Sequence, residues 1–206
     1  MNVIEKQRRF EELTTFLHQL YDKIPESNFA YLWTKQRKET FPFSLPAQIS
    51  LMAQKAIELS DGGVDVYHSV NPINIEPTSG KRGDELSVSY QTAIVIDIDI
   101  RSDAHKGDAD KFPSNFEEAK SFLPFEPSIL IFSGYGLHAY YIFDEPLAIT
   151  DINRDEIKQR NGRLIELVRL RAGLFKKSID SIGDLPRILR TPSTFNYKLG
   201  AEHAPM

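Results

Sequence analysis

The chain has 206 residues, of which 41% are hydrophobic and 26% are charged, which is ordinary for a globular protein and excludes a disordered tail or a fibre. It contains no cysteine, so a disulfide scaffold, a thiolate zinc site, an iron–sulfur cluster and a cysteine nucleophile are excluded. The net charge of −4 argues against a wholly basic nucleic-acid binder, although residues 151–200 carry 11 Lys and Arg against 6 Asp and Glu.

The N-terminal residues are too highly charged for a signal peptide. The most apolar stretch, 128–143, is interrupted by two glycines and by His138, and it is too short and too polar to span a bilayer. We therefore expect a cytoplasmic protein that does not engage a membrane.

Apolar residues at helical spacing predict that the chain opens with an amphipathic helix over about residues 4–24. A second helix is expected over 46–59, with start signals at Ser44 and Pro46 and a stop at the glycine pair 62–63. Further short runs with β-rich or loop composition predict, in chain order, a strand over 28–33, a strand over 64–70 and a long polar loop over 71–89.

The run 92–100 is the clearest predicted strand. Ser114 to Glu117 has the pattern of a capping box and predicts a short helix ending near residue 123. The remaining elements predicted in chain order are a hairpin of strands 128–132 and 137–143, a long helix over 152–175 and a basic, proline-marked segment over 179–198. Helices mixed with an antiparallel hairpin favour the α+β class over a doubly wound parallel sheet.

The strand at 92–100 carries two acidic residues, Asp97 and Asp99, among four isoleucines. Alternation along a strand places both carboxylates on one face and isoleucines on the other. Aspartate is disfavoured in strands, and two neighbouring carboxylates repel each other unless a cation lies between them. Oxygen ligands of this kind suit Mg²⁺ or Mn²⁺, whereas the alternative interpretation is a strand with an ordinary solvated face.

The predicted hairpin turn contains Gly134, Tyr135 and Gly136, with Ser133 before it and His138 after it. The glycines permit a tight turn and a close approach of backbone amides to a phosphate. Ser133 and His138 are expected to face each other across the hairpin, where a hydroxyl and an imidazole can bind a triphosphate. The alternative is a plain turn with a half-buried histidine, and the Gly-x-Ser-x-Gly pattern of a serine hydrolase is absent.

The basic segment that follows supplies a third group of candidates. Asp180 is a candidate third carboxylate. Arg187, Arg190 and Lys198 are candidate phosphate ligands, because guanidinium and ammonium groups both bind phosphate oxygens. The alternative interpretation is a set of surface ion pairs that contribute little to stability.

In their order and spacing these three motifs resemble the archaeo-eukaryotic primase superfamily, and in particular the primase–polymerase domains of plasmids, phages and bacteria. The pair Asp97 and Asp99 matches the family's acidic motif, Ser133 to His138 its serine–histidine motif, and Ile179-Asp180 its third motif. Residues 191–198 are similar to the family's Pro-Gly-Thr-x-Asn-x-Lys ending, with Ser193 where glycine is usual. The likeness extends over about residues 31–198.

The resemblance implies an RRM-like antiparallel catalytic sheet with a smaller packed α/β unit, in a single domain over 1–206. We expect an N-terminal α/β part over 1–90 and a catalytic part over 91–200, within a longer protein that includes a helicase or accessory domain. It also implies a DNA primase–polymerase that copies a single-stranded DNA template with ribo- or deoxynucleoside triphosphates, either by starting primers anew or by extending them.

In that interpretation, two Mg²⁺ or Mn²⁺ ions are held by Asp97, Asp99 and Asp180. The residues expected to bind the nucleotide are Ser133, Gly134, His138, Arg187, Arg190 and Lys198. Arg163, on the long basic helix, and Tyr135 are the candidates for contact with nucleic acid.

Two other functions remain compatible with these residues. One is a metal-dependent nuclease or replication-initiator domain, although the chain has no His-x-His motif. The other is a nucleic-acid-binding module without catalysis, in which the acidic pair is structural. Metal-dependent incorporation of nucleotides separates the three, because a nuclease shortens the strand and a binding module leaves it unchanged.

Overall fold

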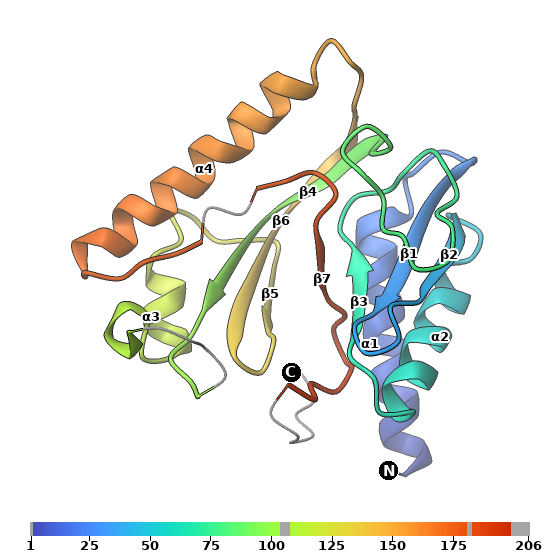
Figure 1. The fold of residues 1–206 in the computed structure, drawn as a ribbon, viewed down its shortest axis with the longest axis horizontal. Coiled ribbons are helices and arrows are strands. Elements are labelled where there is room, and N and C mark those ends of the chain that lie inside the picture. Colours follow the sequence, from blue (N-terminus) through green and yellow to red (C-terminus); the bar gives the residue numbers. More distant parts are fainter. Residues whose placement is uncertain (1, 104–107, 181–182, 199–206) are drawn as a thin grey trace. The chain divides into compact units, whose positions relative to one another are not determined.

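Helices and strands follow one another irregularly along the chain in the computed structural model, which describes residues 2–103, 108–180 and 183–198 (Figure 1). The helices are α1 (Val3–Tyr21), α2 (Ile49–Asp61), the 3-10 helix η1 (Ala109–Lys111), α3 (Phe116–Ser121) and α4 (Arg154–Leu174). The strands are β1 (Asn28–Thr34), β2 (Thr40–Leu45), β3 (Val66–Ser69), β4 (Tyr90–Asp99), β5 (Ile129–Phe132), β6 (Gly136–Ala148) and β7 (Ile188–Arg190).

The chain forms two compact units. The first unit comprises Met1–Ala93, Phe143–Ile149 and Leu185–Met206, and the second comprises Ile94–Ile142 and Thr150–Asp184. The expected catalytic part, 91–200, is therefore distributed over both units. Within the described residues, none of the helices has the length and apolar character needed to cross a membrane.

The first unit is built on a four-stranded sheet with the order β2-β1-β3-β7, in which all neighbouring strands are antiparallel. In this sheet Leu32 pairs with Phe41 on one side and with His68 on the other. The ring of Phe16 in α1 meets His68 edge-on at 5.3 Å, and Lys55 of α2 lies 5.2 Å from the Phe41 ring. Both helices therefore pack on the sheet face that carries this row.

The second unit contains the three-stranded sheet β4-β6-β5 together with α3 and α4. Strands β5 and β6 form the predicted antiparallel hairpin, with Ile129 opposite Tyr140 and Phe132 opposite Leu137. The isoleucines of β4 and the inner side of α4, including Ile165 and Val168, are buried. The expected α+β class with antiparallel sheets is confirmed.

Most predicted elements are present, but two strands were missed. Strand β2 contains Pro42, which normally argues against a strand, and it is tolerated here because β2 is at the edge of the sheet. Strand β7 has only three residues and lies in the segment predicted to be irregular. It forms because its backbone pairs with β3, more than 100 residues earlier in the chain.

The capping box before α3 was placed one residue too early. The side chain of Asn115, rather than Ser114, accepts the capping hydrogen bond from the backbone N–H of Glu118. The carboxylate of Glu118, rather than that of Glu117, in turn accepts hydrogen bonds from the backbone N–H and the hydroxyl of Ser114, both at 2.6 Å. These hydrogen bonds hold the pKa of Glu118 below its usual value.

Candidate active site

The acidic pair lies on β4 as expected from strand alternation. Asp97 and Asp99 are partly exposed, whereas Ile96, which precedes the pair, and Ile98, which lies between its members, are buried. The predicted division into an acidic face and an apolar face is therefore confirmed. The isoleucines fix the strand in the core of the second unit, so the two carboxylates are presented from a rigid element.

His138 lies beside this pair on the neighbouring strand β6. Its Nε2 atom is 3.5 Å from Oδ1 of Asp97, and the residue is 4% exposed. In the hairpin His138 pairs with Ile131, and Ser133 is not opposite it. The expectation that Ser133 and His138 face each other across the hairpin is therefore wrong, because the register places Gly136 next to Ser133 and the histidine two residues further along.

The hairpin turn is held against the end of β4. The backbone N–H of Ile100 donates to the carbonyl oxygen of Tyr135 at 2.9 Å. The backbone N–H of Ser133 donates to the carbonyl oxygen of Gly136 at 2.8 Å, and its hydroxyl donates to the same oxygen at 3.2 Å. Gly134 has a φ of 92°, a conformation that favours glycine.

Gly136 is required for this close approach. A Cβ atom at this position would lie 2.9 Å from the carbonyl oxygen of Ile98, 3.3 Å from Ser133 Oγ and 3.5 Å from the Cα of Asp99. The turn therefore touches the backbone that carries the acidic pair. The structure thus brings together Asp97, Asp99, Ser133, Gly134 and His138, five of the residues predicted from the two strand motifs.

Asp180 is exposed and directly precedes residues outside the described ranges. Within residues 2–103, 108–180 and 183–198, no group of three or more His, Asp or Glu side chains is placed to hold a metal ion. The acidic pair is therefore the part of the predicted metal site that the structure assembles. Its carboxylate oxygens fit a hard divalent cation, while the participation of Asp180 stays a prediction.

The three basic candidates, Arg187, Arg190 and Lys198, belong to the first unit. Lys198 is exposed and Arg187 is half-buried. Arg190, by contrast, is buried in β7, where its Nη1 atom lies 2.5 Å from Oδ1 of Asp65. Its Nη2 atom donates to the Tyr67 hydroxyl at 3.2 Å. This guanidinium thus has a structural role, which sequence reasoning did not predict.

Asp65 is the centre of a buried polar cluster. Burial raises the pKa of its carboxyl, but the backbone N–H of Tyr197 and the guanidinium of Arg190 outweigh this effect. The result is a pKa below the usual value of 3.8. The carboxylate therefore stays charged and fixes both β7 and the segment that follows it.

Arg9 is a second buried cation that sequence reasoning missed. It is 2% exposed, and its guanidinium donates to the Ser193 carbonyl oxygen at 2.7 Å and to Asp61 Oδ1 at 2.9 Å. It also lies 4.3 Å from the centroid of the Phe195 ring. The signal in the sequence was its position four residues before Leu13, on the buried side of α1.

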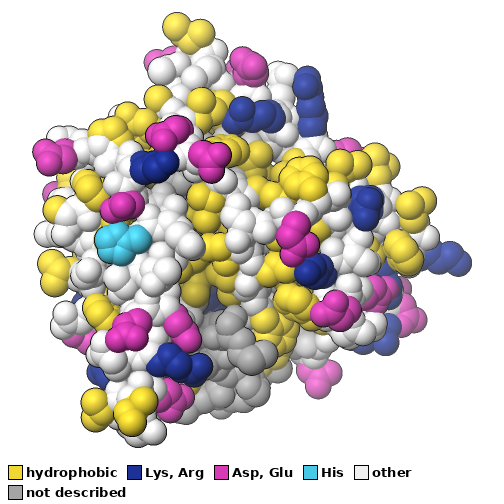
Figure 2. All heavy atoms as spheres, turned by 180° about the vertical axis from the view of Figure 1, so that it is seen from behind, with side chains coloured by type: hydrophobic (Ala, Val, Ile, Leu, Met, Phe, Trp, Pro, Cys, Tyr) yellow, Lys and Arg dark blue, Asp and Glu magenta, His cyan; other side chains and the backbone are white. Residues whose placement is uncertain are grey.

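The two nucleic-acid candidates are both accessible. Arg163 is exposed on α4, and Tyr135 is half-buried at the tip of the hairpin turn. On the face drawn in Figure 2, basic side chains of the described residues lie close to acidic ones. Charge alone therefore does not mark a nucleic-acid path on that face.

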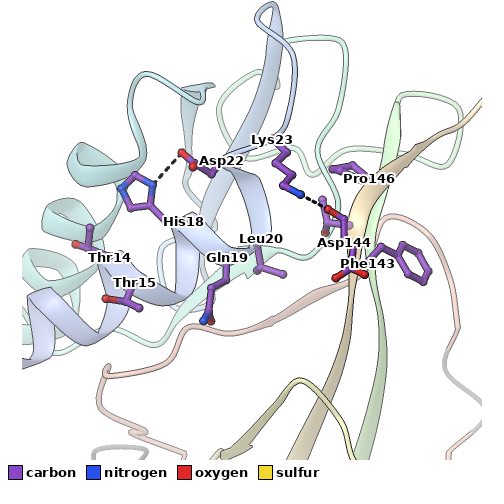
Figure 3. A pocket seen from close by; sticks show the side chains of 11 residues that line it. Thr14, Thr15, His18, Gln19, Leu20, Asp22, Lys23, Phe143, Asp144 and Pro146 are labelled. Carbon is purple, nitrogen blue, oxygen red and sulfur yellow. Dashed lines mark hydrogen bonds and ion pairs between the residues drawn. The ribbon is translucent and has the colours of Figure 1, made fainter.

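A cavity of about 460 Å³ lies in the first unit, and none of the residues that line it is a predicted site residue (Figure 3). Its wall includes His18, Asp22 and Lys23, together with residues of β6. His18 Nδ1 is 3.2 Å from Asp22 Oδ1, and Lys23 Nζ donates to the Asp144 carbonyl oxygen at 2.5 Å. Because these groups pair within the wall, we do not assign the cavity to the active site.

Comparison with known proteins shows which solved structure the fold is similar to. No protein-family model matches the chain, and no curated protein matches it. Among solved structures it is similar to the AEP domain of the primase–polymerase (PrimPol) of cyanophage S-2L, with a TM-score of 0.56 and 15% sequence identity. The match covers 95% of this chain and 89% of that one. The chain thus has the fold of a primase–polymerase domain, as the resemblance of its motifs implied.

Proposed function

We propose that the chain is a nucleotidyltransferase of the primase–polymerase type. The observation that carries this proposal is the acidic pair Asp97 and Asp99 on β4, with His138 Nε2 3.5 Å from Asp97 Oδ1, in a chain with the fold of such a domain. The substrates are a nucleoside triphosphate and the 3′-hydroxyl of a primer on single-stranded DNA.

Asp97 and Asp99 are proposed to hold Mg²⁺ or Mn²⁺, with Asp180 as a further ligand. When bound, a pair of such ions would activate the 3′-hydroxyl of the primer and neutralise negative charge on the triphosphate. The strand keeps the two carboxylates in place before substrate arrives, so little reorganisation is needed at the moment of reaction.

His138, Ser133 and the turn at Gly134 are proposed to bind the triphosphate. The imidazole of His138 has one nitrogen at Asp97 and is held by β6, so it is oriented before the nucleotide binds. Gly134 keeps the turn backbone free of a side chain where phosphate oxygens would approach. Arg187 and Lys198 remain candidates for the same ligand, as does Arg190, whose charge is already paired with Asp65.

Other parts of the expected function are proposed on the same basis. Arg163 and Tyr135 are proposed to contact the template–primer, because both are accessible in the second unit and carry a cation or an aromatic ring. A helicase or accessory domain elsewhere in a longer protein, and a cytoplasmic location, are further expectations.

Primer extension tests the proposal. A labelled primer on a single-stranded template is incubated with ribo- or deoxynucleotides and with Mg²⁺ or Mn²⁺. We expect lengthening that requires metal and that falls at least about 100-fold, or about 3 kcal/mol of activation free energy, in Asp97→Ala and in Asp99→Ala. Asp151→Ala, an exposed acidic residue of the same unit, serves as the matched control and should extend normally.

The same assay separates the alternatives. Shortening of the labelled strand would indicate a metal-dependent nuclease. An unchanged strand with folded protein in every condition would contradict catalysis and leave a nucleic-acid-binding module.

A further inference from the structure

Three planar side chains form a row across the sheet of the first unit. Trp33 of β1 pairs with Tyr67 of β3, and Tyr67 pairs with Arg190 of β7. The centroids of the Trp33 and Tyr67 rings are 5.8 Å apart, and Arg190 Cζ lies 5.2 Å from the centroid of the Tyr67 ring. The register of three neighbouring strands thus places an indole, a phenol and a guanidinium side by side.

The row lies on the sheet face away from α1 and α2. The adjacent row, which includes Leu32 and His68, faces the helices, since His68 meets Phe16 of α1. Side chains of successive residues in a strand point to opposite faces, so Trp33 and Tyr67 point the other way. Both residues are half-buried.

A cation lies at the Trp33 end of the row. Arg82, in the loop between β3 and β4, has its Cζ 5.4 Å from the centroid of the Trp33 ring and is exposed. At the other end, on the edge strand β7, Arg190 is neutralised by Asp65. The accessible part of the row therefore combines two aromatic rings with the positive charge of Arg82. From here on, the name aromatic row stands for Trp33, Tyr67 and the exposed Arg82, and it leaves out the buried Arg190.

We propose that the aromatic row binds single-stranded nucleic acid by stacking its bases. Aromatic rings on a sheet face can stack with any base, because every base has a π-face, and a neighbouring arginine adds attraction to the phosphates. This inference rests on the proposed function for the identity of its ligand, the template strand. It adds a strand-binding surface in the first unit, whereas the acidic pair, Arg163 and Tyr135 belong to the second.

The sequence provides a direct reporter for this test, because Trp33 is the only tryptophan of the chain. The intrinsic fluorescence of the protein is titrated with oligodeoxythymidine of about 16 nucleotides, a length that covers a typical single-strand site. We expect saturable quenching in the native protein and equal quenching in Asp97→Asn plus Asp99→Asn. No quenching at concentrations where a labelled oligonucleotide is bound would overturn the proposal.

Variants provide the second arm, read by fluorescence anisotropy of the labelled oligonucleotide. Arg82→Ala, a substitution of an exposed loop residue, and Trp33→Ala should each weaken binding about tenfold. Phe41→Ala is the matched control, because Phe41 is a half-buried aromatic residue under a lysine on the helix-covered face of the same sheet. Equal weakening by Phe41→Ala, or none by Arg82→Ala and Trp33→Ala, would show that the aromatic row is not the binding surface.

Two further outcomes separate this inference from the proposed function. Quenching without any primer extension would support strand binding and contradict catalysis. Quenching of the same size by free thymidine monophosphate, at equal nucleotide concentration, would overturn strand binding in favour of a mononucleotide pocket.

Discussion

Arg190 shows how the surroundings of a residue decide its role. Its place in a basic, proline-marked segment suggested a phosphate ligand, but its side chain is 8% exposed and pairs with Asp65, which is 5% exposed. A buried pair of this kind costs desolvation, which the Coulomb attraction and extra hydrogen bonds offset. Removing one partner leaves an uncompensated buried charge, so such pairs are sensitive to substitution.

We therefore expect Arg190→Ala to lower the free energy of unfolding by about 3 to 5 kcal/mol, because Asp65 would remain buried without its cation. Arg187→Ala, in the same segment but half-buried, should cost about 1 kcal/mol or less. Urea denaturation of both variants measures the difference. Equal, small losses would show that the pair with Asp65 does not stabilise the fold.

Ser193 illustrates a conformational constraint at the same scale. It stands where the resembled motif has glycine, and its φ is 57°, in the left-handed region. A non-glycine residue there is strained by about 1 to 2 kcal/mol. Its hydroxyl oxygen lies 3.2 Å from Glu12 Oε2 and its carbonyl oxygen accepts from Arg9, and these contacts offset the strain.

Among the elements, the hairpin of β5 and β6 is most closely tied to the site. The turn before Gly136 packs on the backbone of β4 at the acidic pair, and a side chain at Gly136 would collide with the Ile98 carbonyl oxygen. Backbone cannot move aside as a flexible side chain can. The geometry of the site therefore depends on a position that carries no functional group.

Gly136→Ala should destabilise the protein by about 1 to 3 kcal/mol and displace the turn from β4. Gly162→Ala is the control, since a Cβ at that position in α4 would have no described atom within 4 Å other than its chain neighbours and the backbone of its own helix. That substitution should be neutral or stabilising by up to about 1 kcal/mol, because alanine favours a helix interior. Thermal unfolding compares the two, and a neutral Gly136→Ala would mean that the turn is not held against β4.

At the scale of the whole molecule, the first unit is assembled from three separate stretches of chain. The last stretch provides strand β7 and the partners of two buried groups in the first stretch, residues 1–93. Arg9 donates to the Ser193 carbonyl oxygen, and Asp65 accepts from the Tyr197 backbone N–H at 3.0 Å. The fold of residues 1–93 thus depends on residues 185–198.

A chain ending at Asp184 should therefore lose the first unit. It would leave Asp65 without Arg190 and the Tyr197 amide, and β3 without its neighbour β7, at a cost of about 5 kcal/mol or more, comparable with the whole stability of a small domain. Hydrogen exchange should show unprotected amides in α1 and β3. A chain ending at Lys198 is the control, and equal protection in both chains would contradict this dependence.

Most elements of the fold could be predicted because their patterns are local. Strand β4 and helices α1 and α4 have the alternation or helical spacing that one buried face imposes. Strand β2 was missed because Pro42 is acceptable only at a sheet edge, and edge position is not visible in sequence. Strand β7 was missed because three residues carry too little pattern without β3 beside them.

The acidic pair on one face of a strand, the glycine turn and the fold class could all be predicted from the sequence, since each follows from short-range spacing or from a resemblance of ordered motifs. The sequence did not reveal that His138 lies at Asp97, that Arg190 pairs with Asp65, or that Trp33 and Tyr67 form one row. These depend on the register between strands distant in the chain. Register is set by how whole faces are buried, a property that no short motif contains.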